Sequence, residues 1–270
     1  METNDVPRIT VGVMDAPESE LAVRWGAQHA QRVGGTLHLI HAMVWSEMGV
    51  DVDPVPGITD SGMGAAAKGL LDHAAGIAHE VAPNLKVTTE VVSGNATAVL
   101  VGASHDADVI AVGGRGLGRL MSLVVGSKSL ALAARAHCPV VIVRGDIDID
   151  GPIGLVHADN DAVIARAGEL AHAYGVGVDV IAASTTDRSR LGELLGHVRQ
   201  VLREHHEDVQ IGEITAPYGR SARELIRASE GTSMIVAAAP DAPTAEGKVP
   251  VPLELSAVLR FAHTPVWIER

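Results

Sequence analysis

Short runs rich in Val, Ile and Leu alternate along residues 1–147 with longer segments of helical periodicity. The short runs predict the strands Arg8–Met14, Thr36–Met43, Leu85–Val92, Asp108–Gly113 and Pro139–Val143. The segments between them predict the helices Glu18–Val33, Gly64–Val81, Ala96–His105 and Leu123–Ala136. Because parallel neighbours need the crossover connections that helices supply, this alternation predicts a parallel, doubly wound sheet. Trp45–Gly62 is rich in Gly, Pro and Asp, which predicts a long loop.

The second half of the chain repeats this order of elements. His137–Ile142 recurs as His263–Ile268 at an offset of 126 residues, and the same offset aligns Asp108–Val112 with Met234–Ala238. We therefore expect one offset to serve both strands and the connection between them. The remaining predicted elements are the strands Ile153–His157, Val178–Ala183 and Val209–Thr215, and the helices Asp161–Tyr174, Arg188–His205 and Ala222–Ser229.

The two repeats predict two domains, residues 1–147 and 148–270. The segment that joins them, Gly145–Pro152, carries alternating Asp residues and ends in Gly-Pro, which is typical of a linker. The last strand of each domain is an apolar edge that would otherwise stand unpaired. We expect Val140–Val143 and Val266–Glu269 to pair antiparallel about a pseudo-two-fold axis, which would make the chain an intrachain pseudo-dimer. A homodimer of whole chains is left open.

Composition agrees with this architecture and narrows the range of partners. The chain has 270 residues, of which 47% are hydrophobic and 2% aromatic, and this favours two cores of helices packed on buried parallel strands. The formal net charge of −12 disfavours nucleic acid and anionic membrane surfaces as partners. The only cysteine, Cys138, excludes an internal disulfide. The sequence shows no signal-peptide pattern and no apolar run long enough for a bilayer, so we expect a cytoplasmic protein.

A glycine-rich stretch, Gly113–Arg119, carries the most informative chemistry, together with Gly126 and Ser127. It leaves a predicted strand at the carboxyl edge of the sheet, where doubly wound folds bind ligands. Glycine lets the backbone approach an anion closely, and free N–H groups at the start of a helix favour negative charge. The stretch therefore predicts a phosphate site.

Two common phosphate motifs do not fit this spacing. In a P-loop the glycine is followed directly by Lys and then Ser or Thr, but Ser127 separates Gly126 from Lys128. The dinucleotide fingerprint requires a third glycine after Gly118, which is absent, and it follows the first strand of a sheet rather than the fourth. What remains is Gly113-x2-Gly116-x9-Gly126-Ser127.

That pattern resembles the signature of the ATP-binding branch of the universal stress protein family. Val11–Val13 with Pro17–Ser19, and His137–Val141, are similar to the family's first and last elements. The resemblance implies two tandem Rossmann-like domains of the adenine nucleotide alpha hydrolase type, each a five-stranded parallel sheet flanked by helices. It also implies a nucleotide site in the first domain. Its phosphate-binding residues would be Gly113, Gly116, Gly126 and Ser127 with Ser129 close by, and Ala42 or Met43 would lie against the adenine.

Two positions depart from the family pattern. Members that bind ATP have, directly after the first strand, an Asp that contacts the sugar, whereas this chain has Met14 there and Asp15 one residue later. A short shift of the loop would present Asp15 to the sugar, and a capping or turn role before Pro17 is an equal alternative. Lys128 occupies a position that is usually uncharged, where it could meet phosphate charge.

The resemblance implies an ATP-binding, nucleotide-dependent regulatory protein of the stress response, with Mg²⁺ as a companion of the triphosphate. The alternative is an interaction module of the same fold that serves dimerisation and binds no nucleotide. The sequence shows no nucleophile beside a base, no paired carboxylates and no His cluster at metal spacing, so we expect no enzyme activity beyond slow hydrolysis.

The offset of 126 residues predicts that the second domain has lost the phosphate loop. The corresponding pairs are Gly113 and Ala239, Gly116 and Ala242, Gly126 and Pro252, and Ser127 and Leu253. Proline has no N–H to donate, leucine has no hydroxyl, and alanine restricts the backbone angles that glycine allows. We therefore expect one nucleotide per chain, bound in the first domain.

Overall fold

The computed structural model describes residues 6–43, 62–114, 127–148, 150–156, 158–182, 188–204, 206, 208–215, 231–240, 249–251, 255–256, 258–259 and 262–270. The strands are β1 (Arg8–Gly12), β2 (Thr36–Met43), β3 (Val87–Ser93), β4 (Val109–Gly113), β5 (Val140–Val143), β6 (Ile153–Leu155), β7 (Val178–Ala182), β8 (Ile211–Thr215), β9 (Met234–Ala238) and β10 (Val266–Glu269). The helices are α1 (Pro17–Arg32), α2 (Gly62–Val81), α3 (Ala96–Ala103), α4 (Ser127–Ala133), α5 (Asp161–Tyr174) and α6 (Arg188–Arg203).

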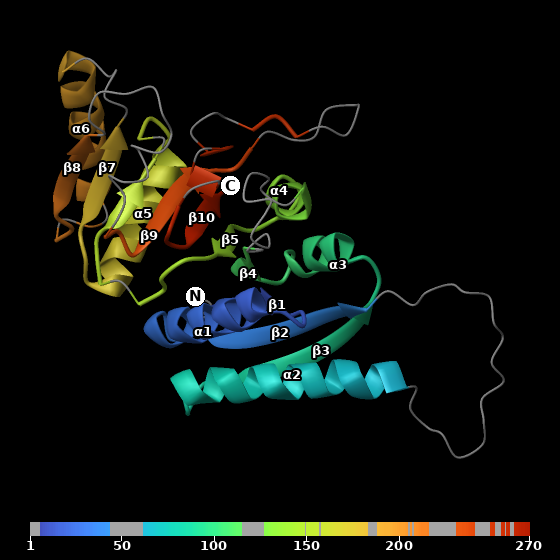
Figure 1. The fold of residues 1–270 in the computed structure, drawn as a ribbon. Helices are drawn as coiled ribbons and strands as arrows, with labels where there is room; N and C mark the ends of the chain where they lie inside the picture. Colours follow the sequence, from blue (N-terminus) through green and yellow to red (C-terminus); the bar gives the residue numbers. More distant parts are fainter. Residues whose placement is uncertain are drawn as a thin grey trace, which may run out of the picture.

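All these strands belong to one ten-stranded sheet in the order β3-β2-β1-β4-β5-β10-β9-β6-β7-β8. Neighbours within each half run parallel, and only the central pair, β5 and β10, is antiparallel. Figure 1 shows the first half in blue to green and the second in yellow to red, on the two sides of this pair. The predicted α/β fold with two tandem five-stranded parallel sheets is confirmed, whereas the boundary at residue 148 stays a prediction.

Most predicted elements are present with ends that differ by one to three residues. β1 ends at Gly12 instead of Met14, and β6 ends at Leu155 instead of His157. The residue after each of these strands still forms a hydrogen bond with a neighbouring strand. The Val13 N–H donates to the Ile40 carbonyl at 2.8 Å, and the Val156 N–H donates to the Val236 carbonyl at 3.0 Å. The backbone then turns away from the sheet toward the following helix.

Six of the predicted segments fall partly or wholly outside the described residues. They are the helix Ala222–Ser229, the loop Trp45–Gly62 except its last residue, the last residue of each of Ile153–His157, Val178–Ala183 and Arg188–His205, and the start of the helix Leu123–Ala136. The described part of that last helix, α4, ends at Ala133.

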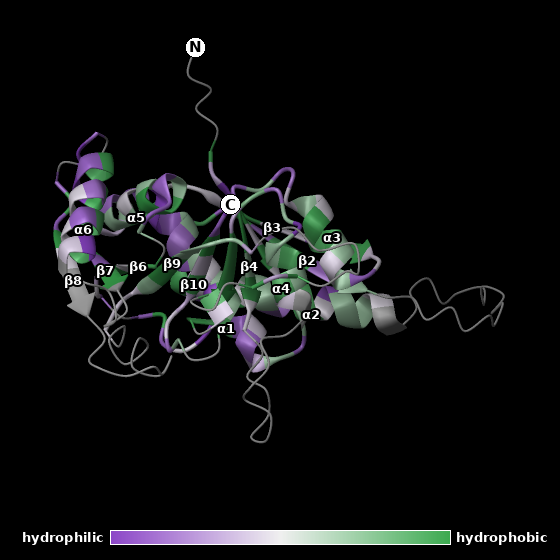
Figure 2. Ribbon diagram, turned by 90° about the horizontal axis from the view of Figure 1, so that it is seen from above, coloured by the Kyte–Doolittle hydropathy of each residue, from purple (hydrophilic) through white to green (hydrophobic). Residues whose placement is uncertain are grey.

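Side chains alternate between the two faces of the sheet, and each face carries an apolar layer. Helices α1, α2, α5 and α6 cover one face, where the core runs without interruption from Val11 in the first half to Leu155 in the second. Helices α3 and α4 lie on the other face, against residues such as Ile110 and Ile142. Figure 2 shows the central strands as mostly hydrophobic, while α5 and α6 have both hydrophobic and hydrophilic residues.

The single offset of 126 residues between the halves is wrong for the fourth strands. Ile110 pairs with Val140 between β4 and β5, and Ile235 pairs with Val266 between β9 and β10. The last strands are therefore 126 residues apart, but the fourth strands are only 125 apart. The connection from β9 to β10 is one residue longer than its counterpart. A slip of one residue puts a strand's side chains on the opposite face, and a continuous apolar run does not reveal it.

This register changes the residue that corresponds to Gly113. The Gly114 N–H donates to the last residue of β5, and the Ala239 N–H donates in the same way to the last residue of β10. Gly113 therefore corresponds to Ala238 and not to Ala239. The other three predicted correspondences involve residues outside the described part of the chain.

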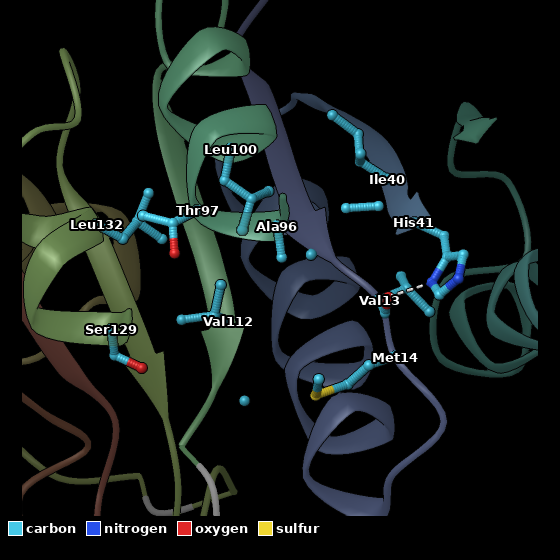
Figure 3. Close-up of a pocket in the computed structure, with 13 residues that line it drawn as sticks. Val13, Met14, Ile40, His41, Ala96, Thr97, Leu100, Val112, Ser129 and Leu132 are labelled. Carbon is cyan, nitrogen blue, oxygen red and sulfur yellow. Dashed lines mark hydrogen bonds between the residues drawn. The ribbon is translucent and has the colours of Figure 1, made fainter. Parts of the chain in front are cut away.

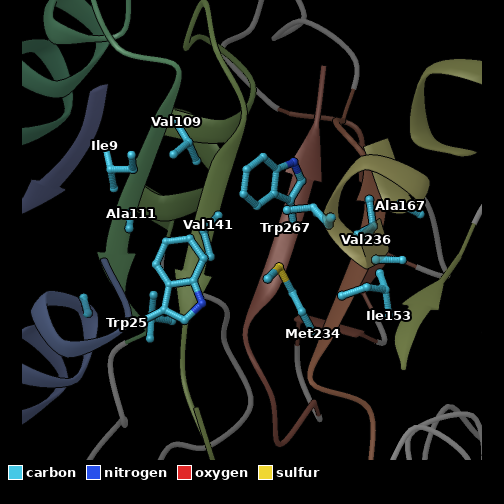
Figure 4. Close-up of a cluster of buried hydrophobic side chains, with 14 of the residues drawn as sticks. Ile9, Trp25, Val109, Ala111, Val141, Ile153, Ala167, Met234, Val236 and Trp267 are labelled. Carbon is cyan, nitrogen blue, oxygen red and sulfur yellow. The ribbon is translucent and has the colours of Figure 1, made fainter. Parts of the chain in front are cut away.

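The junction between the halves is the pairing of β5 with β10. Val141 lies opposite Trp267, and the predicted antiparallel pairing of these two strands is confirmed. Figure 4 shows Trp267 on β10 and Trp25 on α1 at this junction, with ring centroids 6.4 Å apart in an edge-to-face arrangement. Because these large side chains come from both halves, the halves share one core.

A buried polar network supports the aromatic side chains of the junction. The Glu269 carboxylate accepts hydrogen bonds from Arg166 Nε at 2.9 Å and from Trp267 Nε1 at 2.7 Å. His29 stacks on Trp25 and hydrogen-bonds through Nδ1 to the Tyr174 hydroxyl at 3.0 Å. Burial, together with the nearby charges of two arginines, lowers the pKa of His29 to about 3. His29 is therefore neutral in the folded chain at neutral pH, and the buried carboxylate has its partners.

Candidate functional site

A cavity opens at the carboxyl ends of β1, β2 and β4, beside the first turns of α3 and α4 (Figure 3). Its volume is about 180 Å³, below the roughly 300–1,000 Å³ that is common for small-molecule sites, so the described walls enclose only part of a ligand. The chain leaves β1 toward β2 and β3 and then returns to β4 on the other side, so the sheet order reverses here. Doubly wound folds bind ligands at such a switch point. The lining residues are Gly12, Val13, Met14, Ile40, His41, Ala42, Ala96, Thr97, Leu100, Val112, Gly113, Ser129 and Leu132.

Short-range hydrogen bonds fix the backbone at the mouth of this cavity. The chain turns after β1, where the Met14 N–H donates to Ser19 Oγ at 2.9 Å. His41 Nδ1 lies 2.9 Å from the Val13 carbonyl. Because a carbonyl only accepts, Nδ1 donates its proton in this hydrogen bond. At the end of β2, the Gly94 N–H donates to the Met43 carbonyl at 2.9 Å. Gly94 has a φ of 143°, a backbone conformation that favours glycine.

Two glycines at this edge of the sheet lie close to neighbouring atoms. A Cβ atom on Gly12 would lie 3.0 Å from Leu100 Cδ1, so a larger side chain there would enter the space between β1 and α3. A Cβ atom on Gly113 would collide with the Glu18 carbonyl, in the first turn of α1. Gly113 is thus required by helix packing as well as being suited to a close ligand, and its presence alone does not indicate a phosphate.

The wall of the cavity is mainly apolar, and no side chain in its described lining carries a fixed charge. Its polar side chains are His41, Thr97 and Ser129. Burying an unpaired charge in such surroundings is costly, so the enclosed part of a ligand should be neutral and flat or apolar. Anionic groups should lie toward Gly113 and the start of α4.

The structure brings some of the predicted site residues together. Ala42, Gly113 and Ser129 all line the cavity, with Met14 at its mouth. Met43 ends β2 and is bonded to Gly94, outside the lining.

The other predicted residues are not placed in the cavity. Asp15 is exposed and lines a neighbouring hollow between α1 and α2, together with Glu20 and His73. Gly116 and Gly126 lie outside the described residues. Ser127 and Lys128 begin α4, but their side chains are not described.

Sequence reasoning missed several residues of the cavity, among them Gly12 and Thr97. Gly12 is the last residue of β1, and a glycine that ends a strand at the ligand edge was an available signal. Thr97 lies in the first turn of α3, which Asn95 caps by accepting the Thr97 N–H at 3.0 Å. No motif marks Thr97, because its position in the cavity depends on how α3 packs against the sheet.

Among the described residues of the second half, a buried side chain stands at the position that corresponds to Gly12. Ile9 pairs with Leu37 as Ile153 pairs with Val178, so the register makes Val156 the counterpart of Gly12. Val156 is 3% exposed and belongs to the apolar cluster that includes Ile181. The position of Gly12 is therefore occupied in the second half by a buried apolar side chain.

The sequence model of the universal stress protein family matches residues 6–144, just over half of the chain, so the chain belongs to that family. A universal stress protein of Mycobacterium tuberculosis H37Rv is 33% identical over 141 residues, which cover 52% of this chain and 49% of that protein. One of Mycolicibacterium smegmatis is 30% identical over 141 residues, covering 51% of this chain and 48% of that protein. The chain thus spans about half the length of the curated relatives it matches.

The fold of the whole chain is similar to that of solved universal stress proteins. One from Archaeoglobus fulgidus aligns with 97% of this chain and 96% of its own, with a TM-score of 0.74 and 16% identity. A universal stress protein in complex with cAMP aligns with 51% of this chain and 96% of its own, at 21% identity and a TM-score of 0.40. In the described residues, no helix is both long and apolar enough to span a membrane.

Proposed function

We propose that this universal stress protein binds one adenine nucleotide, ATP, in its first half and uses nucleotide occupancy to regulate a partner. The observation that carries the proposal is the cavity at the switch point between β1 and β4, which Gly12 and Gly113 line. Its neutral, mainly apolar wall suits a purine ring. The ends of β2 and β4, with Ala42 and Gly113, lie where the family resemblance places the adenine and the phosphates.

The phosphates would leave the cavity past Gly113 toward the start of α4. Support for this path comes from the spacing Gly113-x2-Gly116-x9-Gly126-Ser127 in the sequence and from Ser129 in the cavity wall. No group of three or more His, Cys, Asp or Glu side chains suited to a metal occurs among the described residues. Any Mg²⁺ would therefore be expected to arrive with the triphosphate.

The second half would then have a structural role. Its five strands extend the sheet across the β5–β10 pair, and its carboxyl edge is packed with side chains such as Val156. A second copy of the fold in the same chain would take the place of a partner subunit, as in the intrachain pseudo-dimer expected from the sequence. The apolar core shared by both halves favours this role.

The rival function is an interaction module that carries no nucleotide. The two are separated by purifying the chain without added nucleotide, denaturing it and identifying the released small molecules by mass spectrometry. ATP or AMP released in near-stoichiometric amount supports the proposal. No released nucleotide, together with no heat of binding when ATP is titrated into the folded chain, would favour the rival.

A matched pair of variants locates the site. Gly126→Trp should abolish ATP binding while the chain stays folded, because a bulky side chain occupies the space that a phosphate needs beside the backbone. Gly76→Trp on α2, where a Cβ has open space around it, should bind normally. Unchanged binding by folded Gly126→Trp would move the site elsewhere.

We also propose that hydrolysis is absent or slow. The side chains in the described lining include no carboxylate, and the only imidazole is His41, bonded through Nδ1 to the Val13 carbonyl. Incubation of the chain with radiolabelled ATP should give turnover well below about 1 s⁻¹, the low end of common enzyme rates. Turnover at ordinary enzyme rates that disappears in Gly126→Trp would contradict this.

A further inference from the structure

Two residues with hydroxyl groups line the cavity from two neighbouring helices. Figure 3 shows Thr97 on α3 and Ser129 on α4. The neighbouring wall is apolar, formed by Leu100 and Leu132. Thr97 and Ser129 come from segments more than thirty residues apart, so only the packing of the two helices brings them to one cavity.

Neither hydroxyl has a structural task in the described part of the chain. Asn95 already caps α3 by accepting the Thr97 N–H, so the Thr97 hydroxyl is not needed as a cap. Nearby hydroxyls do have such tasks: Ser19 Oγ accepts the Met14 N–H, and Ser104 Oγ donates to the Val101 carbonyl. The described residues provide no hydrogen-bond partner for the side chains of Thr97 and Ser129.

A ligand that closes this cavity would displace the water around both hydroxyls. A polar group that loses water without gaining a partner weakens binding, so a ligand that binds well must bring acceptor atoms to this place. Both hydroxyls are neutral donors that can approach an oxygen of an anion without a charge of their own. A phosphate group has enough oxygens to accept from both at once.

We propose that Thr97 and Ser129 together hold the phosphate group attached to the nucleoside, between α3 and α4. This inference rests on the proposed nucleotide site and adds a specificity rule to it. A nucleoside monophosphate has the group that both hydroxyls bind, and a nucleoside lacks it. Thr97 is therefore a ligand-binding residue outside the glycine-rich stretch.

The test compares AMP with adenosine, by calorimetric titration of the full chain. Thr97→Val removes the hydroxyl at nearly constant volume and should weaken AMP binding about tenfold, the size expected for a hydrogen bond to a charged group. Adenosine affinity should change less than about twofold. Thr97→Ser retains the hydroxyl and should keep AMP affinity within about threefold. Thr89→Val, an exposed Thr on β3 outside the cavity, is the matched control.

Ser129→Ala should likewise weaken the binding of AMP more than the binding of adenosine. If both hydroxyls bind one phosphate, the double variant Thr97→Val/Ser129→Ala should lose less than the product of the single losses, because the two bonds share an acceptor group. Thermal unfolding checks that each variant is folded.

Three results would overturn the inference. Unchanged AMP affinity in folded Thr97→Val would show that the Thr97 hydroxyl does not bind the phosphate, but it would leave the proposed function intact. Equal losses for AMP and adenosine would assign the hydroxyl to the nucleoside instead of the phosphate. If the unsubstituted chain binds neither AMP nor ATP, the proposed function itself fails, and the inference fails with it.

Discussion

At the carboxyl edge of its sheet, the first half of the chain has Gly12 where the second half has the buried Val156. Gly12 ends the first strand of its half, Val156 directly follows the first strand of the other half, and the two five-stranded sheets have the same strand order. Gly12 lines a cavity, whereas Val156 belongs to the apolar core in the described part of the second half. One backbone plan thus supports either a binding site or a packed edge, and a small number of side chains decide which.

The difference has a cost in stability. Full burial of a valine side chain contributes about 1.5–3 kcal/mol, and a cavity at the same place forgoes this contribution. The first half lacks a buried side chain at a position where the second half has one. Ligand binding explains this difference better than a requirement of folding does.

The strongest test of this comparison makes the first half resemble the second. Gly12→Val should reduce nucleotide affinity on the order of a hundredfold or more, because the side chain enters the cavity beside Leu100. The variant should stay folded, since its nearest neighbour is the flexible end of a side chain. Calorimetry measures the affinity, and Gly102→Ala on α3, where a Cβ meets nothing, is the control. Full affinity in folded Gly12→Val would show that the cavity is not the site.

A second prediction concerns the junction that both halves share. Folding lowers the pKa of His29 from its ordinary 6.5 to about 3, so the unfolded chain binds a proton there at pH values where the folded chain does not. Stability should therefore be full above pH 6.5 and decrease as the pH falls. The contribution of His29 lost by about pH 5 is about 2 kcal/mol.

Urea unfolding of the chain and of His29→Gln, each at several pH values, measures this contribution. The unsubstituted chain should lose stability more steeply than His29→Gln below pH 6.5, and the two curves should run parallel above it. Equal slopes throughout would mean that His29 is not held neutral at the junction.

The smallest expected effect concerns a pair of equivalent residues before the last strands. Cys138 of the first half is matched in the second by Thr264, whose hydroxyl is buried without a hydrogen-bond partner in the described structure. Thr264→Val should stabilise the chain by about 1 kcal/mol, because it removes an unsatisfied polar group at nearly constant volume. The urea midpoint reports the change. Cys138→Val, which removes no such group, should give a smaller gain, and a loss of stability in Thr264→Val would show that the hydroxyl is bonded.

Much of the fold follows from sequence patterns that act locally. Apolar runs and helical periodicity predicted β2 and α5 with the bounds that the structure has. The antiparallel pairing of β5 with β10 followed from two apolar edges that needed a partner. These features depend on neighbours along the chain or on a general property of strand edges.

The errors arise where distant segments meet. The offset between β4 and β9 was one residue too large, because similar apolar letters do not determine which residue faces which side. Thr97 lines the cavity only because of the way α3 packs against the sheet. Asp15 lines the hollow between α1 and α2, because β1 ends two residues earlier than predicted. Such placements depend on three-dimensional contacts that a sequence pattern does not contain.

The contrast between an open first half and a filled second half is tested most directly by counting bound nucleotides. The chain is titrated with a slowly hydrolysed ATP analogue, at protein concentrations well above the dissociation constant, so that calorimetry reports the number of sites. The cavity beside Gly12 and the buried Val156 predict saturation at one equivalent per chain. Saturation at two equivalents, or a site that survives Gly12→Val at full affinity, would contradict the account.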